Sequence, residues 1–381
     1  MNHPKTINTP DNSSNQAVEE SPSINYSLSG GLARRLKQLN LSIAFTSYQS
    51  NLLYMLGILP NGSVHLHQSA MAKPMGLALD NNGGLVLSTG FQVIELINIL
   101  KDNEHINKTF NACYLPRTIH LTGALDAHDV GIDVNDRIIF VNTSFNCLAT
   151  ISNRHSFEMV WKPPFISNLV QEDRCHLNGL AMLDGQPAFA TAVSRSDTID
   201  GWRDRRDSGG IVIDVQANKI ICDGLSMPHS PRIHKGELWV LNAGTGELGV
   251  VARSQNNNGL PETGHFEPRV FCPGFLRGLA FQDNFAFVGL SKPRYERFEG
   301  LALDQRLKDA DSEPWCGIQI IDLEKRCCVD WLRIDGAVSE LFDVQIISGS
   351  SCPMTISPTS QESTTMITYD NDTLQQQRLP K

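Results

Sequence analysis

A step of glycine, an apolar residue and alanine or aspartate recurs through the middle of the chain about every fifty residues. Each copy is followed by a second and a third apolar run, and a fourth run closes several of the units. Four short runs in each period of roughly 45 to 55 residues are typical of the antiparallel blades of a β-propeller. The copies begin at Gly76, Gly131, Gly179, Arg232, Gly278 and Asp343, of which Arg232 and Asp343 begin degenerate copies.

The two ends of this repeated region complement each other. The last copy, at Leu341 to Ile347, has room for one innermost strand, whereas the region opens with Ser42 to Thr46, Leu52 to Leu56 and Val64 to His67, which resemble the second to fourth strands of a blade. Joining them in one sheet leaves no open edge. We therefore predict an all-β fold: a six-bladed β-propeller closed by N- and C-terminal strands that share the last blade. A seventh blade and a two-sheet sandwich are the alternatives.

Composition divides the chain into one domain and two tails. Residues 1–30 and 352–381 carry few apolar residues and many Ser, Thr, Asn, Gln and Pro, so burial cannot offset the entropy of ordering them. We expect the first tail to be disordered and the second to be mostly disordered. Residues 31–351 are predicted to form a single propeller domain, with a short helix at Leu32 to Leu39 packed outside it.

Charge and hydropathy exclude several classes of protein. The formal net charge of −9 does not suit the phosphates of a nucleic acid, so we expect no nucleic-acid partner. Because no apolar run approaches the roughly 20 residues that span a bilayer, we expect no membrane partner either. The nine cysteines lack CxxC spacing and the N-terminal residues lack the pattern of a secretory signal, which together favour reduced thiols in a cytoplasmic protein.

Histidine stands three residues before the step in three consecutive copies, at His128, His176 and His229. Since the first strand of each blade lines the axis, these side chains are expected to meet at one mouth of the central channel. Three neutral imidazoles suit a divalent metal ion, so all three are candidate metal ligands. Together with Asp129, they are also candidate catalytic acids and bases. The remaining interpretation is structural: channel-lining side chains hydrogen-bonded to carbonyl groups and water.

Further polar side chains are expected around the same mouth. Two long segments, Ser194 to Gly210 and Ser291 to Trp315, each follow a second strand and so leave on this face, where long insertions commonly form a binding surface. Arginine beside an aromatic ring suits a planar carboxylate, a phosphate or a sugar. If the charges of these loops instead pair with one another, the loops form a solvated lid. The candidate ligand-binding residues are Asn178, Arg277, Trp202, Arg203, Arg294, Tyr295, Glu340 and Asp343.

Five segments of the chain stand in a characteristic order: Ala127 to Val130, Cys175 to Ala181, Met227 to Arg232, Leu241 to Leu248 and Phe275 to Ala280. Together they resemble a bacterial family of conserved hypothetical proteins of unknown function, over about residues 40 to 350. This resemblance implies no specific chemistry. The His-x-Asn-Gly piece at His176 to Gly179 also resembles the start of a strand in calcium-dependent six-bladed lactonases, whose acidic metal ligands have counterparts here only in Glu340 and Asp343.

The sequence therefore predicts a propeller that binds a small polar ligand, either a carboxylate or a sugar-like molecule, at the axial mouth. In its enzymatic form the protein is a lyase or hydrolase in which His128, His176 and His229 hold a divalent metal ion that polarises the substrate. The alternative is a non-catalytic propeller whose two long loops grip a protein partner. A deep pocket over the histidines would favour the small molecule, and a flat apolar surface would favour the protein.

Overall fold

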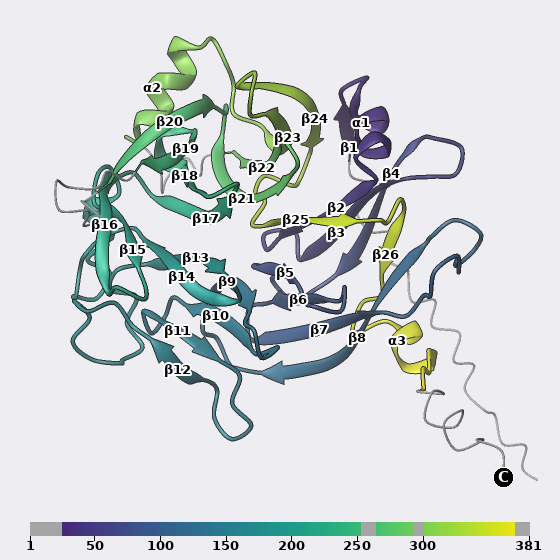
Figure 1. Cartoon of the computed structure of the whole chain (residues 1–381), viewed down its shortest axis with the longest axis horizontal. Helices are drawn as coiled ribbons and strands as arrows, with labels where there is room; N and C mark the ends of the chain where they lie inside the picture. The colour runs from purple at the N-terminus through teal and green to yellow at the C-terminus, as the bar shows by residue number, and fades with distance from the viewer. Residues whose placement is uncertain (1–24, 253–263, 293–299, 370–381) are drawn as a thin grey trace, which may run out of the picture.

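The computed structural model describes residues 25–252, 264–292 and 300–369. Six sheets stand around a central axis in a ring (Figure 1). Within each blade the strands pair antiparallel, and the chain passes from the outer strand of one blade to the innermost strand of the next. The six-bladed β-propeller predicted from the repeat is confirmed.

Each blade contains four strands in order from the axis outward. The first blade comprises β25 (Val344–Ser348), β2 (Leu41–Ser47), β3 (Leu52–Ile58) and β4 (Val64–Ala70). The second comprises β5 (Leu77–Leu79), β6 (Leu85–Ser88), β7 (Gln92–Asn98) and β8 (Ala112–Leu121). The third comprises β9 (Ala127–Ile132), β10 (Ile138–Asn142), β11 (Cys147–Thr150) and β12 (Glu158–Trp161). The fourth blade comprises β13 (Leu177–Leu183), β14 (Gln186–Ala192), β15 (Gly210–Asp214) and β16 (Lys219–Leu225). The fifth comprises β17 (Pro228–His234), β18 (Glu237–Asn242), β19 (Glu247–Ala252) and β20 (His265–Phe271). The sixth comprises β21 (Phe275–Gln282), β22 (Phe285–Ser291), β23 (Cys316–Asp322) and β24 (Cys327–Asp335).

The first blade is built from both ends of the repeated region. β25 pairs antiparallel with β2, from Leu41 opposite Ser348 to Phe45 opposite Val344. This pairing joins the last innermost strand to the three strands that begin the region, so the predicted sharing of one blade is confirmed. It also satisfies the inner edge of β2, which would otherwise expose unpaired backbone groups.

The core lies between neighbouring blades. All seven residues of β2 are buried, and Phe45 in β2 stacks on Tyr54 in β3 with ring centroids 4.8 Å apart. These rings belong to the apolar cluster that joins the first blade to the blade of β21–β24. Because neighbouring blades cover both faces of a sheet, the inner strands are buried on both sides. This explains why they appear in the sequence as continuous apolar runs.

Four of the short elements outside the four-stranded blades lie near the two ends of the described chain. α1 (Leu32–Leu39) is the helix expected there, and it buries Leu32 and Leu36. β1 (Asn25–Leu28) extends one sheet by pairing with β24, and β26 (Pro353–Thr355) runs parallel to β8 ahead of α3 (Gln361–Thr365).

β1, β26 and α3 fall in segments expected to be tails. β1 is held by backbone pairing while its side chains stay largely exposed, so composition carries no signal of it. The remaining parts of the expected tails, residues 1–24 and 370–381, lie outside the described residues.

The conformation of Gly278 in the innermost strand β21 explains why one copy of the repeat has glycine at this position. Its φ is +82°, and a Cβ atom there would lie 2.6 Å from the backbone nitrogen of Val344 in the next blade. Since backbone cannot move aside, we expect Gly278→Ala to lower the free energy of unfolding by about 2–4 kcal/mol. Gly236 also has positive φ, +80°, but faces open space, so Gly236→Ala should cost only about 1–2 kcal/mol. Urea unfolding of both variants checks this; equal losses would contradict it.

Candidate functional site

Three predicted histidines lie at one mouth of the ring, where the inner strands begin. His128 and His229 are the second residues of β9 and β17, and His176 directly precedes β13. All three are buried. The rings of His128 and His176 meet edge to face with centroids 4.9 Å apart, and charges at both positions influence the pKa of His229.

The three histidines do not share one register, contrary to the prediction. Ala127 pairs with Asn142 and Pro228 pairs with Asn242, so His128 and His229 hold equivalent positions. In the blade between them, Leu177 opens the strand pairing, which places Asn178 at the equivalent position. At the mouth, three consecutive blades therefore place His128, Asn178 and His229 at the equivalent position. His176 lies two positions earlier.

Backbone carbonyl groups set the orientation of His128 and His229 in the same way. Nδ1 of His128 lies 2.9 Å from the carbonyl oxygen of Asp126, and Nδ1 of His229 lies 2.8 Å from that of Met227. Asp126 and Met227 both have positive φ, 53° and 48°. Since a carbonyl only accepts, Nδ1 donates and Nε2 keeps its lone pair. Burial lowers the pKa of both histidines, with the nearby Arg277 lowering it further, so both are neutral at pH 7.

His176 has different partners. Its Nδ1 lies 2.7 Å from Oδ2 of Asp173, and its ring stacks on Trp202 with centroids 4.2 Å apart and 26° between the planes. The φ of His176 is +51°, a value that costs energy for a residue other than glycine. A carboxylate that accepts from one nitrogen fixes the tautomer and the orientation of the imidazole, which leaves the other nitrogen as an acceptor. His176 therefore has the geometry of a general base.

Aromatic rings and a buried arginine continue around the mouth. The guanidinium carbon of Arg277 lies 4.9 Å from the ring centroid of Phe342 and 5.7 Å from that of Phe275. Phe342, which precedes β25, also contacts His128 in β9. Phe275 in β21 contacts His229 in β17. These aromatic contacts therefore join residues from four of the six blades. Burial lowers the pKa of Arg277, but a guanidinium stays charged at neutral pH.

Two acidic side chains lie close to this arginine. Glu340 accepts a hydrogen bond from the hydroxyl of Tyr48, and it and Asp126 favour the charged form of Arg277. Sequence reasoning identified Glu340 and Arg277 but missed Asp126, Phe342 and Asp173. Each of these three residues lies within three positions of a predicted site residue, and this proximity is the signal in the sequence that could have identified it.

Polar atoms without a protein partner gather at this mouth. Among the described residues, Nδ2 of Asn178, Nε2 of His229, Nε of Arg277 and Nε1 of Trp202 are buried and make no hydrogen bond. Buried polar groups in folded proteins are nearly always paired, and leaving one unpaired costs about 1–3 kcal/mol. A cluster of such atoms from three consecutive blades and a loop is the pattern expected where a ligand supplies the partners.

Asp129 and Asp343, predicted as catalytic and ligand-binding residues, lie beneath the mouth and serve another purpose. Asp129 accepts from both terminal nitrogens of Arg232, at 2.8 and 3.2 Å, and from the backbone nitrogens of Val130 and Leu180. Asp343 accepts from the backbone of Leu77 and Val344 and lies 3.6 Å from Arg232. Because their oxygens are already engaged in joining blades, these carboxylates are not available to a ligand at the mouth.

The predicted metal site is not formed by the described residues. Among them, no group of three or more His, Cys, Asp or Glu side chains is arranged to hold an ion. The physical reason is the register: the chain places Asn178 where a third equivalent histidine was expected, and His176 turns onto Trp202.

The long loop from Ser194 to Gly210 turns one aromatic side chain inward. Trp202, which precedes η1 (Arg203–Arg205), packs on His176, whereas Arg203 lies on the outer side of Trp202, 4.6 Å from its ring, and pairs with the exposed Asp200. Arg203 is therefore a surface residue and not part of the mouth. The second loop contains α2 (Ala302–Asp309), and its predicted residues Arg294 and Tyr295 lie outside the described residues. None of the described helices has the length and apolar character to cross a membrane.

Solved structures with a similar arrangement include the nidogen/laminin complex, with a TM-score of 0.49, 8% identity, and coverage of 81% of this chain and 99% of that chain. A putative oxidoreductase (glucose dehydrogenase) from Thermus thermophilus has a TM-score of 0.45 and 11% identity, covering 77% and 93% of the two chains. Virginiamycin B lyase from Staphylococcus aureus has a TM-score of 0.38 and 10% identity, covering 70% and 96%. All three TM-scores are below 0.5, so none bears on the ligand or the reaction.

Sequence comparison places the chain in a family but attaches no activity to it. No curated protein sequence matches the chain. The expected resemblance to a family of unknown function is confirmed, since the family model described as a domain of unknown function (DUF4915) matches residues 30–356, and the chain therefore belongs to this family.

Proposed function

We propose that the protein binds a small hydroxylated carboxylic acid, of the sugar-acid class, at the mouth formed by His128, Asn178, His229 and Arg277. The observation that carries this proposal is the set of buried, unpartnered atoms Nδ2 of Asn178, Nε2 of His229 and Nε of Arg277. The first and last are donors, and the imidazole nitrogen is an acceptor. A ligand that satisfies all three must accept from two groups and donate to the third.

The charge distribution favours a ligand with one carboxylate and several hydroxyl groups. Arg277 is a buried cation, which suits a carboxylate because charge-assisted hydrogen bonds are the strong ones. His128 and His229 are neutral, so their lone pairs require a donor such as a hydroxyl group. The rings of Phe342 and Trp202 offer apolar contact for the carbon skeleton.

The inward position of Trp202 supports a small molecule over a protein partner. A loop that gripped a protein would present its large aromatic side chain outward, where such residues supply most of the binding energy. Here Trp202 is buried against His176, and the exposed residues Asp200 and Arg203 pair with each other. We expect this arrangement in a loop that contributes to a small-molecule site and not in a loop that docks a protein.

The pair of His176 and Asp173 supports a catalytic form of the same proposal. With Nδ1 held by the carboxylate, Nε2 of His176 is the atom that would take a proton from a bound substrate or from water. Lyase or hydrolase chemistry on the bound acid is therefore the enzymatic version. In this version Asp173 orients the base, and its proton transfer requires no metal ligand among the histidines.

Calorimetric titration with D-glucuronate tests the binding site. We expect wild-type protein to bind D-glucuronate more tightly than D-glucose, which lacks the carboxylate, or acetate, which lacks the hydroxyl groups. Arg277→Gln should raise the dissociation constant of D-glucuronate about 10- to 100-fold, since hydrogen bonds to charged groups contribute about 1.5–3 kcal/mol. The matched control Arg203→Gln, on the outer side of Trp202, should leave it unchanged.

Two results would overturn this assignment. One is the absence of D-glucuronate binding to the wild-type protein. The other is equal affinity of the wild-type and Arg277→Gln proteins, provided that both show the same circular dichroism spectrum and thermal transition.

A further inference from the structure

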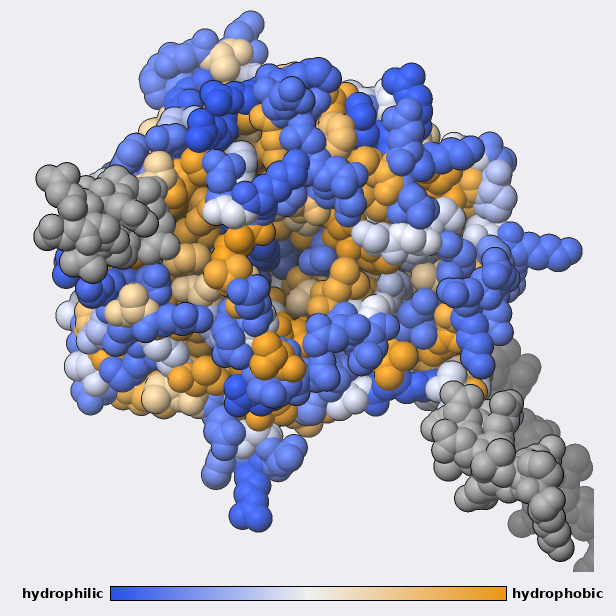
Figure 2. All heavy atoms as spheres, in the orientation of Figure 1, coloured by the Kyte–Doolittle hydropathy of each residue, from blue (hydrophilic) through white to orange (hydrophobic). Residues whose placement is uncertain are grey.

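The end of the ring opposite the histidines holds a separate cavity. Its volume is about 410 Å³, and all six innermost strands contribute to its walls, for example through Leu79 in β5, Met182 in β13 and Phe281 in β21. In the view of Figure 2 the centre of the ring is hollowed and surrounded largely by apolar residues. The volume lies within the roughly 300–1,000 Å³ of small-molecule sites.

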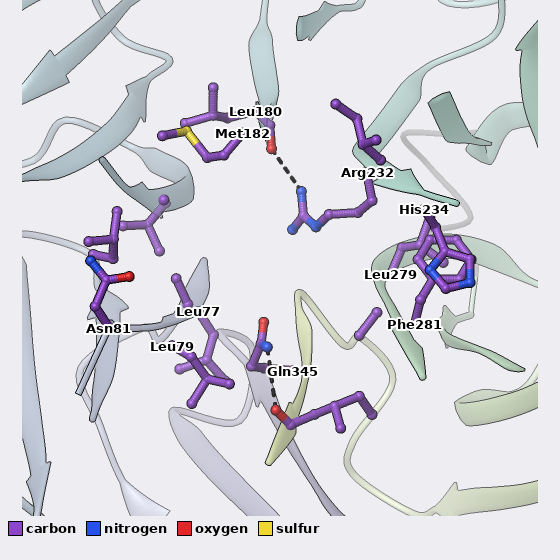
Figure 3. Close-up of a pocket in the computed structure, with 17 residues that line it drawn as sticks. Leu77, Leu79, Asn81, Leu180, Met182, Arg232, His234, Leu279, Phe281 and Gln345 are labelled. Carbon is purple, nitrogen blue, oxygen red and sulfur yellow. Dashed lines mark hydrogen bonds between the residues drawn. The ribbon is translucent and has the colours of Figure 1, made fainter. Parts of the chain in front are cut away.

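A buried ionic cluster separates this cavity from the histidine mouth. Arg232 lies between Asp129 and Asp343, and the two carboxylates also bind backbone nitrogens of β5, β9, β13 and β25 or their immediate neighbours. Figure 3 shows Arg232 reaching toward the middle of the ring beside the carbonyl group of Leu180. The cavity therefore has a polar floor, and its walls are separate from the histidine mouth.

The floor offers donors and no free acceptor. Arg232 lines the cavity, whereas neither Asp129 nor Asp343 does. The Arg232 side chain is 22% exposed, and within the described part of the chain its hydrogen bonds to Asp129 and Leu180 use the terminal nitrogens and not Nε. A guanidinium has five donor hydrogens and no acceptor, so a ligand that reaches Arg232 meets only donors on this side chain. An oxygen acceptor on the ligand is the complementary group.

The charge of the floor argues against an anionic ligand. The charge of Arg232 is already balanced by Asp129, and burial together with Asp129 raises the pKa of Asp343 to about 7. A carboxylate placed on Arg232 would bring a third acidic group close to these two. An uncharged carbonyl oxygen accepts the same hydrogen bond without that repulsion.

We propose that this cavity binds a small, uncharged and largely apolar molecule that carries a carbonyl oxygen, with the oxygen on Arg232 and the apolar body against the strand ends. Leu77, Leu180 and Leu279 line the inner part of the wall. His234, which stacks on Phe281 with centroids 4.5 Å apart, and Gln345 supply the polar rim. The site is independent of the carboxylate site at the other mouth.

Three matched probes test the ligand chemistry by calorimetric titration. 2-Acetonaphthone has an apolar body and one carbonyl oxygen, 2-ethylnaphthalene lacks the oxygen, and 2-naphthoate carries a charge in its place. We expect 2-acetonaphthone to bind about 10- to 100-fold more tightly than 2-ethylnaphthalene, the effect of one hydrogen bond to a charged guanidinium. It should bind more tightly than 2-naphthoate by a similar factor or more. Equal affinity for all three, tightest binding of 2-naphthoate, or no binding of 2-acetonaphthone would overturn the proposal.

Variants locate the binding in this cavity. Ala280→Phe fills the space from β21, and Ala78→Phe fills it from β5, so each is expected to abolish binding of 2-acetonaphthone. Two variants are used because either one alone could disturb folding, which thermal unfolding would show. Arg277→Gln, at the other mouth, should leave this binding unchanged. Binding that persists in a folded filled variant, or that is lost in Arg277→Gln, would contradict the assignment.

Discussion

Shortening the chain to end at Asp343 is expected to abolish cooperative folding of the propeller. The shortened chain lacks β25, the innermost strand of the first blade, and with it the pairing that closes the ring. Val344, Ile346 and Ile347 are buried, and burying each contributes about 1.5–3 kcal/mol. Their sum is comparable with the roughly 5–15 kcal/mol that separate folded from unfolded states in proteins of ordinary stability.

Urea unfolding followed by circular dichroism measures this effect. A chain that ends at Tyr369 keeps every described strand and is the matched control, so we expect it to unfold in the same transition as the full chain. A single cooperative transition of near wild-type stability in the shorter chain would show that β25 is dispensable for closure. Both truncations lack residues 370–381, so the difference between them reports the loss of residues 344–369, which hold β25 together with β26 and α3.

Replacing Arg232 with Met is expected to lower the free energy of unfolding by about 3–5 kcal/mol at pH 8. The substitution leaves Asp129 and Asp343 buried without their cation. Arg333→Met is the control, because Arg333 and Asp335 form an exposed pair whose loss should cost less than about 1 kcal/mol. Wild-type stability of Arg232→Met at pH 8 would show that this ionic cluster does not hold the blades together.

The pH dependence of Arg232→Met follows from Asp343. Burial, together with Asp129, raises the pKa of Asp343 to about 7 in the folded protein, compared with about 3.9 in an unfolded chain. Between these values the folded state keeps a proton that the unfolded state has released, so the contribution of this group to stability falls as pH rises from 4 through 7. Removing Arg232 strengthens this dependence. The difference in unfolding free energy between wild type and variant should therefore be larger at pH 8 than at pH 5.

Local pattern was sufficient to predict the fold. The recurring step at positions such as Gly131 and Gly179 marks strands that repeat one local structure, and four apolar runs in each period leave few ways to pair. The incomplete first and last copies predicted that β2 and β25 share a sheet. The outer strand β1 escaped prediction because backbone pairing at an exposed edge requires no apolar side chains.

The candidate site was predicted in outline and differs in detail. Spacing in the sequence brought His128, His176 and His229 to one mouth, because every blade presents its first strand to the axis. Spacing could not show that His176 lies two residues before the position equivalent to His128 and His229. The register of a blade depends on which residue of its first strand is the first to pair with the second strand. Nor could it show that Asp129 points to Arg232, more than one hundred residues away.

The sequence by itself determined the number of blades, their closure and the end of the ring at which the histidines gather, because these follow from local repetition. Only the tertiary structure decided which polar atoms are paired and which are left for a ligand. Pairing depends on side chains from different blades meeting at the axis. For this reason Asp129 and Asp343 became part of the scaffold through Arg232, while Arg277 and His229 kept unpartnered nitrogens at the mouth.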